Sequence, residues 1–216
     1  MISFCWCPFT RAERVFWMLE EVGVEYEPVL VDIRKDPRSD PAGFTAASPL
    51  GKVPAITDPG SGSGAGGEAK IADSAAIAMY LGDRYAAGRL APALDDPLRG
   101  EYLTWTLFTP SVIEPAMSEL VSGAEAQPTR NAWGSWETML AALETRLTGR
   151  EWIVGDDFTM ADLMVAGSID FMAQFGMLEP SPVLQRYRER ARSRPAAVRA
   201  GEEQAKLIEG ADFTAP

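Results

Sequence analysis

The sequence predicts an α/β domain with a mixed sheet, followed by an all-helical domain. Over residues 1–90, short β-prone runs alternate with apolar residues at helical spacing. After residue 90 no strand pattern recurs, and amphipathic helical segments follow one another. The composition agrees with a globular protein, since 46% of the residues are hydrophobic and 24% are charged.

The first domain is predicted to run from residue 1 to residue 87. Val15, Met18, Leu19 and Val22 are spaced as on one helix face, and Gly23 follows them as a C-cap. The Ser/Gly-rich segment 60–67 separates two β-prone runs, which predicts a hairpin with a long loop. The polar segment 36–47 is expected to hold a short irregular helix at most. The predicted strands are 2–5, 26–33, 52–57 and 69–72, and the predicted helices are 11–22 and 73–85.

The second domain is predicted to span residues 97–216, after a Pro-, Gly- and Asp-rich linker at 88–96. Pro110 and Pro115 should interrupt its first long helix. Thr159 and Asp162 are three residues apart and predict a capping-box variant at the start of another helix. The predicted helices are 98–121, 130–147, 160–175, 183–194 and 195–208.

Composition excludes several classes of function. A net charge of −11 argues against binding to nucleic acid or to an anionic membrane surface. The chain has no histidine, which removes Ser-His-Asp and Cys-His catalysis and any histidine-based metal site. No signal peptide or membrane-spanning run is evident, and the two cysteines suggest free thiols in a reducing compartment. We therefore expect a cytoplasmic protein without a metal.

A cysteine precedes a proline at the predicted turn from the first strand to the first helix, in Cys7-Pro8-Phe9-Thr10. Proline is favoured at the first helical position, so Cys7 is expected to be the N-cap. Its sulfur would then face unpaired N–H groups and the positive end of the helix dipole, which stabilise a thiolate. The alternative is that Cys7 is a small buried apolar residue.

Four segments together resemble the cytosolic glutathione transferase family over the whole chain. They are the Cys7-Pro8-Phe9 turn with the following Leu19-Glu20-Glu21-Val22-Gly23 run, the loop Ser48-Pro49-Leu50-Gly51-Lys52-Val53-Pro54, the helix start Asp73-Ser74-Ala75-Ala76-Ile77, and Phe158-Thr159-Met160-Ala161-Asp162. The Cys-Pro-Phe turn is similar to that of the omega-like and glutaredoxin-like branches. A bacterial member of the family is expected.

The resemblance implies a thioredoxin-like first domain, a helical second domain and a homodimer. It also implies glutathione as co-substrate. Asp73 and Ser74 would bind its γ-glutamyl end, although the family more often has Glu or Gln at the position of Asp73. The backbone of Val53, before a cis Pro54, would pair with the cysteinyl part, and Lys52 could reach the glycine carboxylate. An N-cap role for Asp73 and a solvated surface position for Lys52 are the alternatives.

Two residues compete as the catalytic group. Cys7 would form a mixed disulfide with glutathione and favour thiol transfer, by a monothiol route because Thr10 occupies the place of a second cysteine. The Thr10 hydroxyl would instead stabilise the thiolate of glutathione for attack on an electrophile. The expected activity is therefore conjugation of glutathione to small electrophiles, or a thiol transferase or reductase reaction through Cys7. The alternative function is a non-catalytic binding module with the same fold.

An electrophile pocket is expected between the two domains. The first helix of the second domain carries aromatic and hydroxyl side chains at helical spacing. Such a stripe is also typical of a helix core, and that alternative stays open. The candidate pocket residues are Phe9, Tyr102, Trp105, Phe108 and Thr109.

Overall fold

The computed structural model describes residues 1–35, 43–60 and 67–209. The chain divides into two compact units. The first unit comprises residues Met1–Tyr85 and Pro195–Pro216, and the second comprises Ala86–Arg194. Parts of the predicted segments 36–47 and 60–67 lie outside the described residues. The predicted order, an α/β unit with a mixed sheet and then helices, is confirmed.

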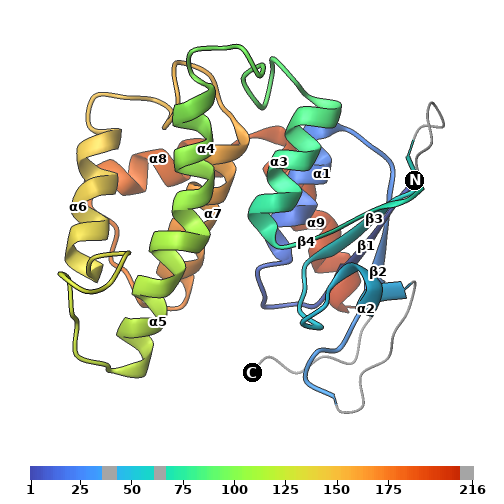
Figure 1. Ribbon diagram of the computed structural model, residues 1–216, viewed down its shortest axis with the longest axis horizontal. Helices are drawn as coiled ribbons and strands as arrows, with labels where there is room; N and C mark the ends of the chain where they lie inside the picture. Colours follow the sequence, from blue (N-terminus) through green and yellow to red (C-terminus); the bar gives the residue numbers. More distant parts are fainter. Residues whose placement is uncertain (36–42, 61–66, 210–216) are drawn as a thin grey trace. The chain divides into compact units, whose positions relative to one another are not determined.

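A mixed sheet forms the centre of the first unit (Figure 1). In the described residues its strand order is β2-β1-β3-β4, with β1 and β2 parallel and the other pairs antiparallel. The antiparallel pairing of β3 with β4 confirms the predicted hairpin. The strands are β1 (Ile2–Trp6), β2 (Tyr26–Leu30), β3 (Ala55–Asp58) and β4 (Ala69–Ala72).

Three helices pack together on one face of this sheet, and a short helix lies on the other side (Figure 1). On the helical face, Phe16 of α1 makes edge-to-face contacts with Phe4 and Trp6 of β1, at centroid distances of 4.8 and 4.9 Å. All three rings are buried. The helices are α1 (Glu13–Val22), α3 (Ser74–Tyr85) and α9 (Pro195–Glu209) on the first face, and α2 (Phe44–Ala47) on the other.

The last helix, α9, packs against the first one, α1. The Arg199 guanidinium donates to the Glu20 carboxylate at 2.8 Å, and the Gln204 side-chain amide donates to the Glu13 carbonyl at 3.0 Å. The sequence predicts α9 as a helix, but it assigns this helix to the helical domain by chain order alone. Packing places α9 with the sheet-containing unit.

A buried carboxylate ties the β3–β4 hairpin to α3. Asp58, at the end of β3, accepts hydrogen bonds from the Tyr80 and Tyr85 hydroxyls at 2.7 and 2.6 Å. Arg84 forms an ion pair with the same carboxylate at 3.2 Å. Burial would raise the pKa of Asp58, but the hydrogen bonds from Tyr85 and Tyr80 outweigh it and hold that pKa below its usual value. Asp58 is therefore a structural anion.

The second unit contains α4 to α8 (Figure 1). The predicted helix 98–121 is interrupted as expected, by a π-helical turn at Thr109–Ile113 that contains Pro110. The helix predicted from residue 130 begins later, because Ser135 is the N-cap and forms a capping box with Thr138. The helices are α4 (Arg99–Phe108), α5 (Glu114–Ser122), α6 (Trp136–Leu147), α7 (Met160–Gln174) and α8 (Pro182–Arg192). No helix of the described chain is both long and apolar enough to cross a membrane.

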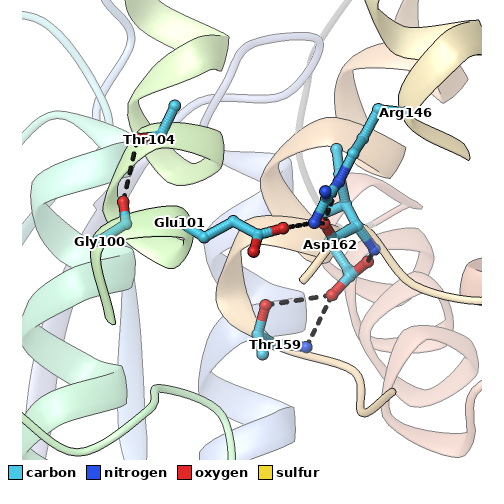
Figure 2. A network of polar contacts seen from close by, with 7 residues as sticks. Gly100, Glu101, Thr104, Arg146, Thr159 and Asp162 are labelled. Carbon is cyan, nitrogen blue, oxygen red and sulfur yellow. Dashed lines mark hydrogen bonds and ion pairs between the residues drawn. The ribbon is translucent and has the colours of Figure 1, made fainter. Parts of the chain in front are cut away.

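The predicted capping box at the start of α7 is confirmed (Figure 2), and both of its residues are buried. The Asp162 carboxylate accepts from the N–H of Thr159 at 2.9 Å and from the Thr159 hydroxyl at 3.1 Å. It also accepts from the N–H of Ile153 at 2.7 Å and from the Tyr187 hydroxyl at 2.9 Å. One side chain thus connects the start of α7, the preceding loop and α8.

The same loop is held from the other side by Arg146 of α6. Its guanidinium donates to the Ile153 carbonyl, with Nε at 2.7 Å, and forms an ion pair with Glu101 of α4 (Figure 2). Burial and the charge of Arg150 lower the pKa of Arg146, while Asp162 opposes them. The N–H of Ile153 therefore donates to the Asp162 carboxylate, and its C=O accepts from the Arg146 guanidinium.

Replacing Asp162 is expected to destabilise the second unit. In Asp162→Ala, the Ile153 N–H, the Thr159 N–H and the Tyr187 hydroxyl lose their acceptor while buried. The free energy of unfolding should fall by about 3 kcal/mol or more. Urea denaturation followed by circular dichroism measures the change. Asp157→Ala, which removes a nearby exposed carboxylate, is the control and should change stability by less than about 0.5 kcal/mol.

The stability contributed by Asp162 should depend on pH. Burial raises the pKa of this carboxyl from 3.8 to about 6 in the folded protein, against the hydrogen bonds it accepts. Because the pKa of Asp162 is higher in the folded than in the unfolded protein, its protonation stabilises the fold. This stabilisation is complete below pH 3.8 and is lost as the pH rises through about 6. The stability difference between wild type and Asp162→Asn should therefore shrink by about 1 kcal/mol between pH 5 and pH 7. A difference that grows with pH over this interval would contradict the prediction.

Candidate active site

The strand register brings three predicted site segments to one end of the sheet. Cys5 of β1 pairs with Ala55 of β3, and Ala55 pairs with Ala72 of β4. Because β3 is antiparallel to both neighbours, its start lies beside the ends of β1 and β4. Adjacent strands are about 4.8 Å apart, so the segments that follow β1 and β4 and precede β3 are neighbours. These segments are 7–10, 73–74 and 52–54.

The turn after β1 differs from the sequence prediction. The first helix begins at Glu13 and its N-cap is Ala12, so Cys7 is not the N-cap and its sulfur does not gain the helix dipole predicted for it. The reason lies in Phe9, whose φ of 60° is left-handed and cannot continue into a helix. The Glu13 carboxylate accepts the Phe9 N–H at 2.7 Å and holds this conformation.

Thr10 organises the remainder of this turn. Its hydroxyl donates to the Cys7 carbonyl at 2.6 Å and accepts the Ala12 N–H at 3.2 Å. The residue is partly exposed. A threonine hydroxyl proton can rotate to another acceptor without moving the oxygen. Thr10 therefore offers a fixed oxygen with a movable proton immediately before α1.

Cys7 occupies a different environment. Its side chain is fully buried, as is most of Cys5. Burial raises the pKa of the Cys7 thiol, and the opposing backbone hydrogen bond from Ile33 and the charge of Arg34 are too weak to reverse this. A buried thiol with a raised pKa has little thiolate character at neutral pH. The geometry thus favours the alternative in which Cys7 is a packed apolar residue.

The loop before β3 has the predicted form. The Val53–Pro54 peptide bond is cis. The Ser48 hydroxyl closes the loop by donating to the Lys52 carbonyl at 2.7 Å and accepting the Lys52 N–H at 2.9 Å. In the described part of the chain, the N–H and C=O of Val53 take part in no hydrogen bond. An extended peptide could pair with this donor and acceptor.

At the start of α3, Asp73 caps the helix and is also accessible to a ligand, so both of its predicted roles are compatible with the structure. This residue is left-handed, with φ 76°, and its carboxylate accepts the Ala75 N–H at 2.8 Å, so it caps the helix. Its side chain is also exposed. Ser74 is the first residue of α3, and its hydroxyl forms no hydrogen bond within the described residues. A ligand carboxylate could therefore meet a free hydroxyl at a helix N-terminus.

The residues of the expected electrophile pocket fall into two groups. Tyr102 and Thr109 are fully buried, so in this structure they present no surface to a ligand, contrary to the expectation. Trp105 and Phe108 are partly exposed and pack on each other at a centroid distance of 4.8 Å. Phe9 is partly exposed in the turn after β1. Of the five candidates, Phe9, Trp105 and Phe108 are accessible enough to contact a ligand.

Sequence reasoning missed two residues that shape the site. Glu13 holds the left-handed Phe9, and Ser48 closes the loop that ends at the cis proline. The spacing of four between Phe9 and Glu13 gave a weak signal, because an acid early in a helix often accepts a preceding N–H. Ser48 could have been noticed as a hydroxyl at the start of a Pro-Gly turn.

The chain belongs to the glutathione S-transferase family. Residues 6–84 match the family model for the glutathione S-transferase N-terminal domain, and residues 116–190 match the model for the C-terminal domain. Glutathione S-transferase Z2 of Arabidopsis thaliana is 31% identical over 197 residues, which cover 86% of this chain and 83% of that protein.

Two further proteins are similar to this chain over most of its length. The disulfide-bond oxidoreductase YfcG of Escherichia coli K12 is 24% identical over 203 residues, covering 91% of this chain and 92% of that protein. The structure of a sphingomonad glutathione S-transferase, solved in complex with glutathione, superposes with a TM-score of 0.74 at 26% identity. That alignment covers 94% of this chain and 98% of the other.

Both thiols should react slowly in the folded protein. Cys5 and Cys7 are buried, and the pKa of Cys7 is raised. With Ellman's reagent at pH 7.5, we expect the reaction of the native protein to be at least about a hundredfold slower than that of a small thiol. Denaturation in urea should release two thiols per chain, which controls for prior oxidation. A rapid reaction of one native thiol would show that Cys7 is accessible and activated.

Proposed function

We propose that this protein is a glutathione transferase that conjugates glutathione to a small electrophile, with Thr10 as the residue that assists the glutathione thiol. The observation that carries the proposal is the register of β1, β3 and β4, which gathers the Thr10 turn, Val53 and Ser74 at one end of the sheet. Family membership and a relative solved with glutathione support the same co-substrate.

Each part of glutathione has a partner in this arrangement. The cysteinyl backbone pairs with the N–H and C=O of Val53, as a short strand added at the start of β3. The γ-glutamyl carboxylate is received by the Ser74 hydroxyl and the first turn of α3. The exposed ammonium of Lys52 is available to the glycine carboxylate. This orientation directs the sulfur of glutathione toward the turn after β1.

Thr10 then acts on the sulfur. Its hydroxyl proton turns from the Cys7 carbonyl to the glutathione sulfur and stabilises the thiolate, whose proton passes to solvent. The thiolate attacks the electrophilic carbon, a carbon–sulfur bond forms, and the leaving group departs with its electron pair. The N–H of Ala12 holds the Thr10 oxygen in place during this step.

A second candidate is thiol transfer through Cys7. It is favoured by the relative that is named a disulfide-bond oxidoreductase. Here the Cys7 thiolate would attack a mixed disulfide and release the substrate thiolate, and a second glutathione would regenerate the cysteine. Burial of Cys7 argues against this route, because the turn would have to open before the sulfur could react.

Removing the Thr10 hydroxyl should reduce conjugation. We expect Thr10→Val to lower kcat/KM for glutathione and 1-chloro-2,4-dinitrobenzene by about tenfold to a hundredfold, because one hydrogen bond to the thiolate is lost. The pKa of bound glutathione, measured by thiolate absorbance, should rise in parallel. Thr10→Ser keeps the hydroxyl and is the matched control, with activity within about threefold of wild type.

Cys7→Ser separates the two candidates. Conjugation and reduction of a glutathione mixed disulfide should both remain near the wild-type rate if Thr10 is the catalytic residue. Loss of disulfide reduction in Cys7→Ser, together with full activity in Thr10→Val, would establish the thiol-transfer route instead. Glutathione binding without turnover of either substrate by the wild type would favour the non-catalytic binding module.

A further inference from the structure

A small cavity in the second unit is lined by none of the residues assigned to glutathione. It is formed where the end of α6 meets one face of α8, and its volume is about 130 Å³. The α8 residues in its wall are spaced by three and four, as on a single helix face. The lining residues are Leu147, Gly149, Arg150, Val183, Arg186, Tyr187 and Arg190.

Three of these lining residues are arginines and none is acidic. Within the described residues, the side chains of Arg150 and Arg186 take part in no hydrogen bond or ion pair. Arg190 donates to the Glu151 carbonyl at 3.0 Å and lies over the Trp152 ring at 5.8 Å. This convergence of positive charge occurs in a chain whose net charge is −11.

In the part of the chain that the structure describes, no acidic side chain forms an ion pair with Arg150, Arg186 or Arg190. Glu189, beside Arg190 in the sequence, accepts the Gln185 side chain at 2.6 Å. The Tyr187 hydroxyl is bound to Asp162 inside the unit. Glu151 and Asp156 line an adjoining open hollow of about 470 Å³ that shares Gly149 and Arg150 with the cavity. The charge of Arg150 also lowers the pKa of Arg146, as expected for two guanidinium groups near each other.

We propose that this cavity binds a phosphate group, either as inorganic phosphate or as the end of a small phosphate monoester. Guanidinium groups bind phosphate oxygens through paired, charge-assisted hydrogen bonds, and a dianion matches several converging arginines. The cavity of about 130 Å³ has room for one tetrahedral oxyanion and is small for a tripeptide. Leu147 and Val183 provide apolar wall that a carbon substituent can contact.

Binding of inorganic phosphate to the full chain tests the proposal. Isothermal titration calorimetry is carried out at constant ionic strength, with sodium chloride replaced by sodium phosphate. We expect saturable binding of one phosphate per chain to the wild type. Arg150→Gln and Arg186→Gln should each weaken that binding at least about tenfold, because each removes a charged donor from the cavity.

Arg192→Gln is the matched control. Like Arg186→Gln, it removes one positive charge from α8, but Arg192 does not line the cavity and instead pairs with Asp170 at 3.6 Å. Phosphate affinity should stay within about twofold of wild type in this variant. Equal weakening in all three variants would overturn the proposal, because it would indicate unspecific attraction to positive charge in this region and not binding in the cavity.

Two further ligands define the specificity. Glycerol 3-phosphate that binds more tightly than inorganic phosphate supports a monoester as the ligand, and binding of inorganic phosphate alone supports the free ion. Acetate that binds as tightly as phosphate would overturn the assignment to a phosphate group, as would the absence of saturable phosphate binding by a folded wild type. Circular dichroism of each variant identifies any loss of folding.

Discussion

The antiparallel insertion of β3 between β1 and β4 is the constraint on which the candidate active site depends. Its register places Cys5, Ala55 and Ala72 side by side, and the chain leaves the sheet at the same end on all three strands. The register therefore makes the turn after β1, the loop before β3 and the start of α3 neighbours. A slip of β3 by one residue would invert its side chains and move Val53 away from both partners.

Much of the fold could be predicted because local chemistry and tertiary structure agree. The interruption near Pro110 and the capping box at Thr159 follow from residues whose conformational preferences are strong, whereas the cis Val53–Pro54 bond is expected from the family resemblance. The turn after β1 could not be predicted in the same way. Phe9 adopts a left-handed conformation that its residue type disfavours, and Glu13 stabilises it from within the helix.

The sequence also could not predict the properties that depend on burial. A Cys-Pro pair at a strand end is equally consistent with an exposed thiolate and with a packed thiol, and only the surroundings of Cys7 distinguish them. The arginine-lined cavity is a similar case. Arg150 lies 36 residues before Arg186, and their proximity depends on how α6 packs against α8. Periodicity along the chain predicts neither the burial of Cys7 nor the proximity of Arg150 and Arg186.

The position of α9 affects how the protein reaches its folded state. Helix α9 covers α1 through the contacts of Arg199 and Gln204, yet a ribosome synthesises it after every other described helix. The sheet-containing unit is therefore discontinuous in sequence, and its nascent form lacks the contacts of α9 with α1 while the second unit is being made. The second unit is contiguous and can complete its own core first. The fold thus allows the second unit to finish folding before the sheet-containing unit, although the second unit is made later in the chain.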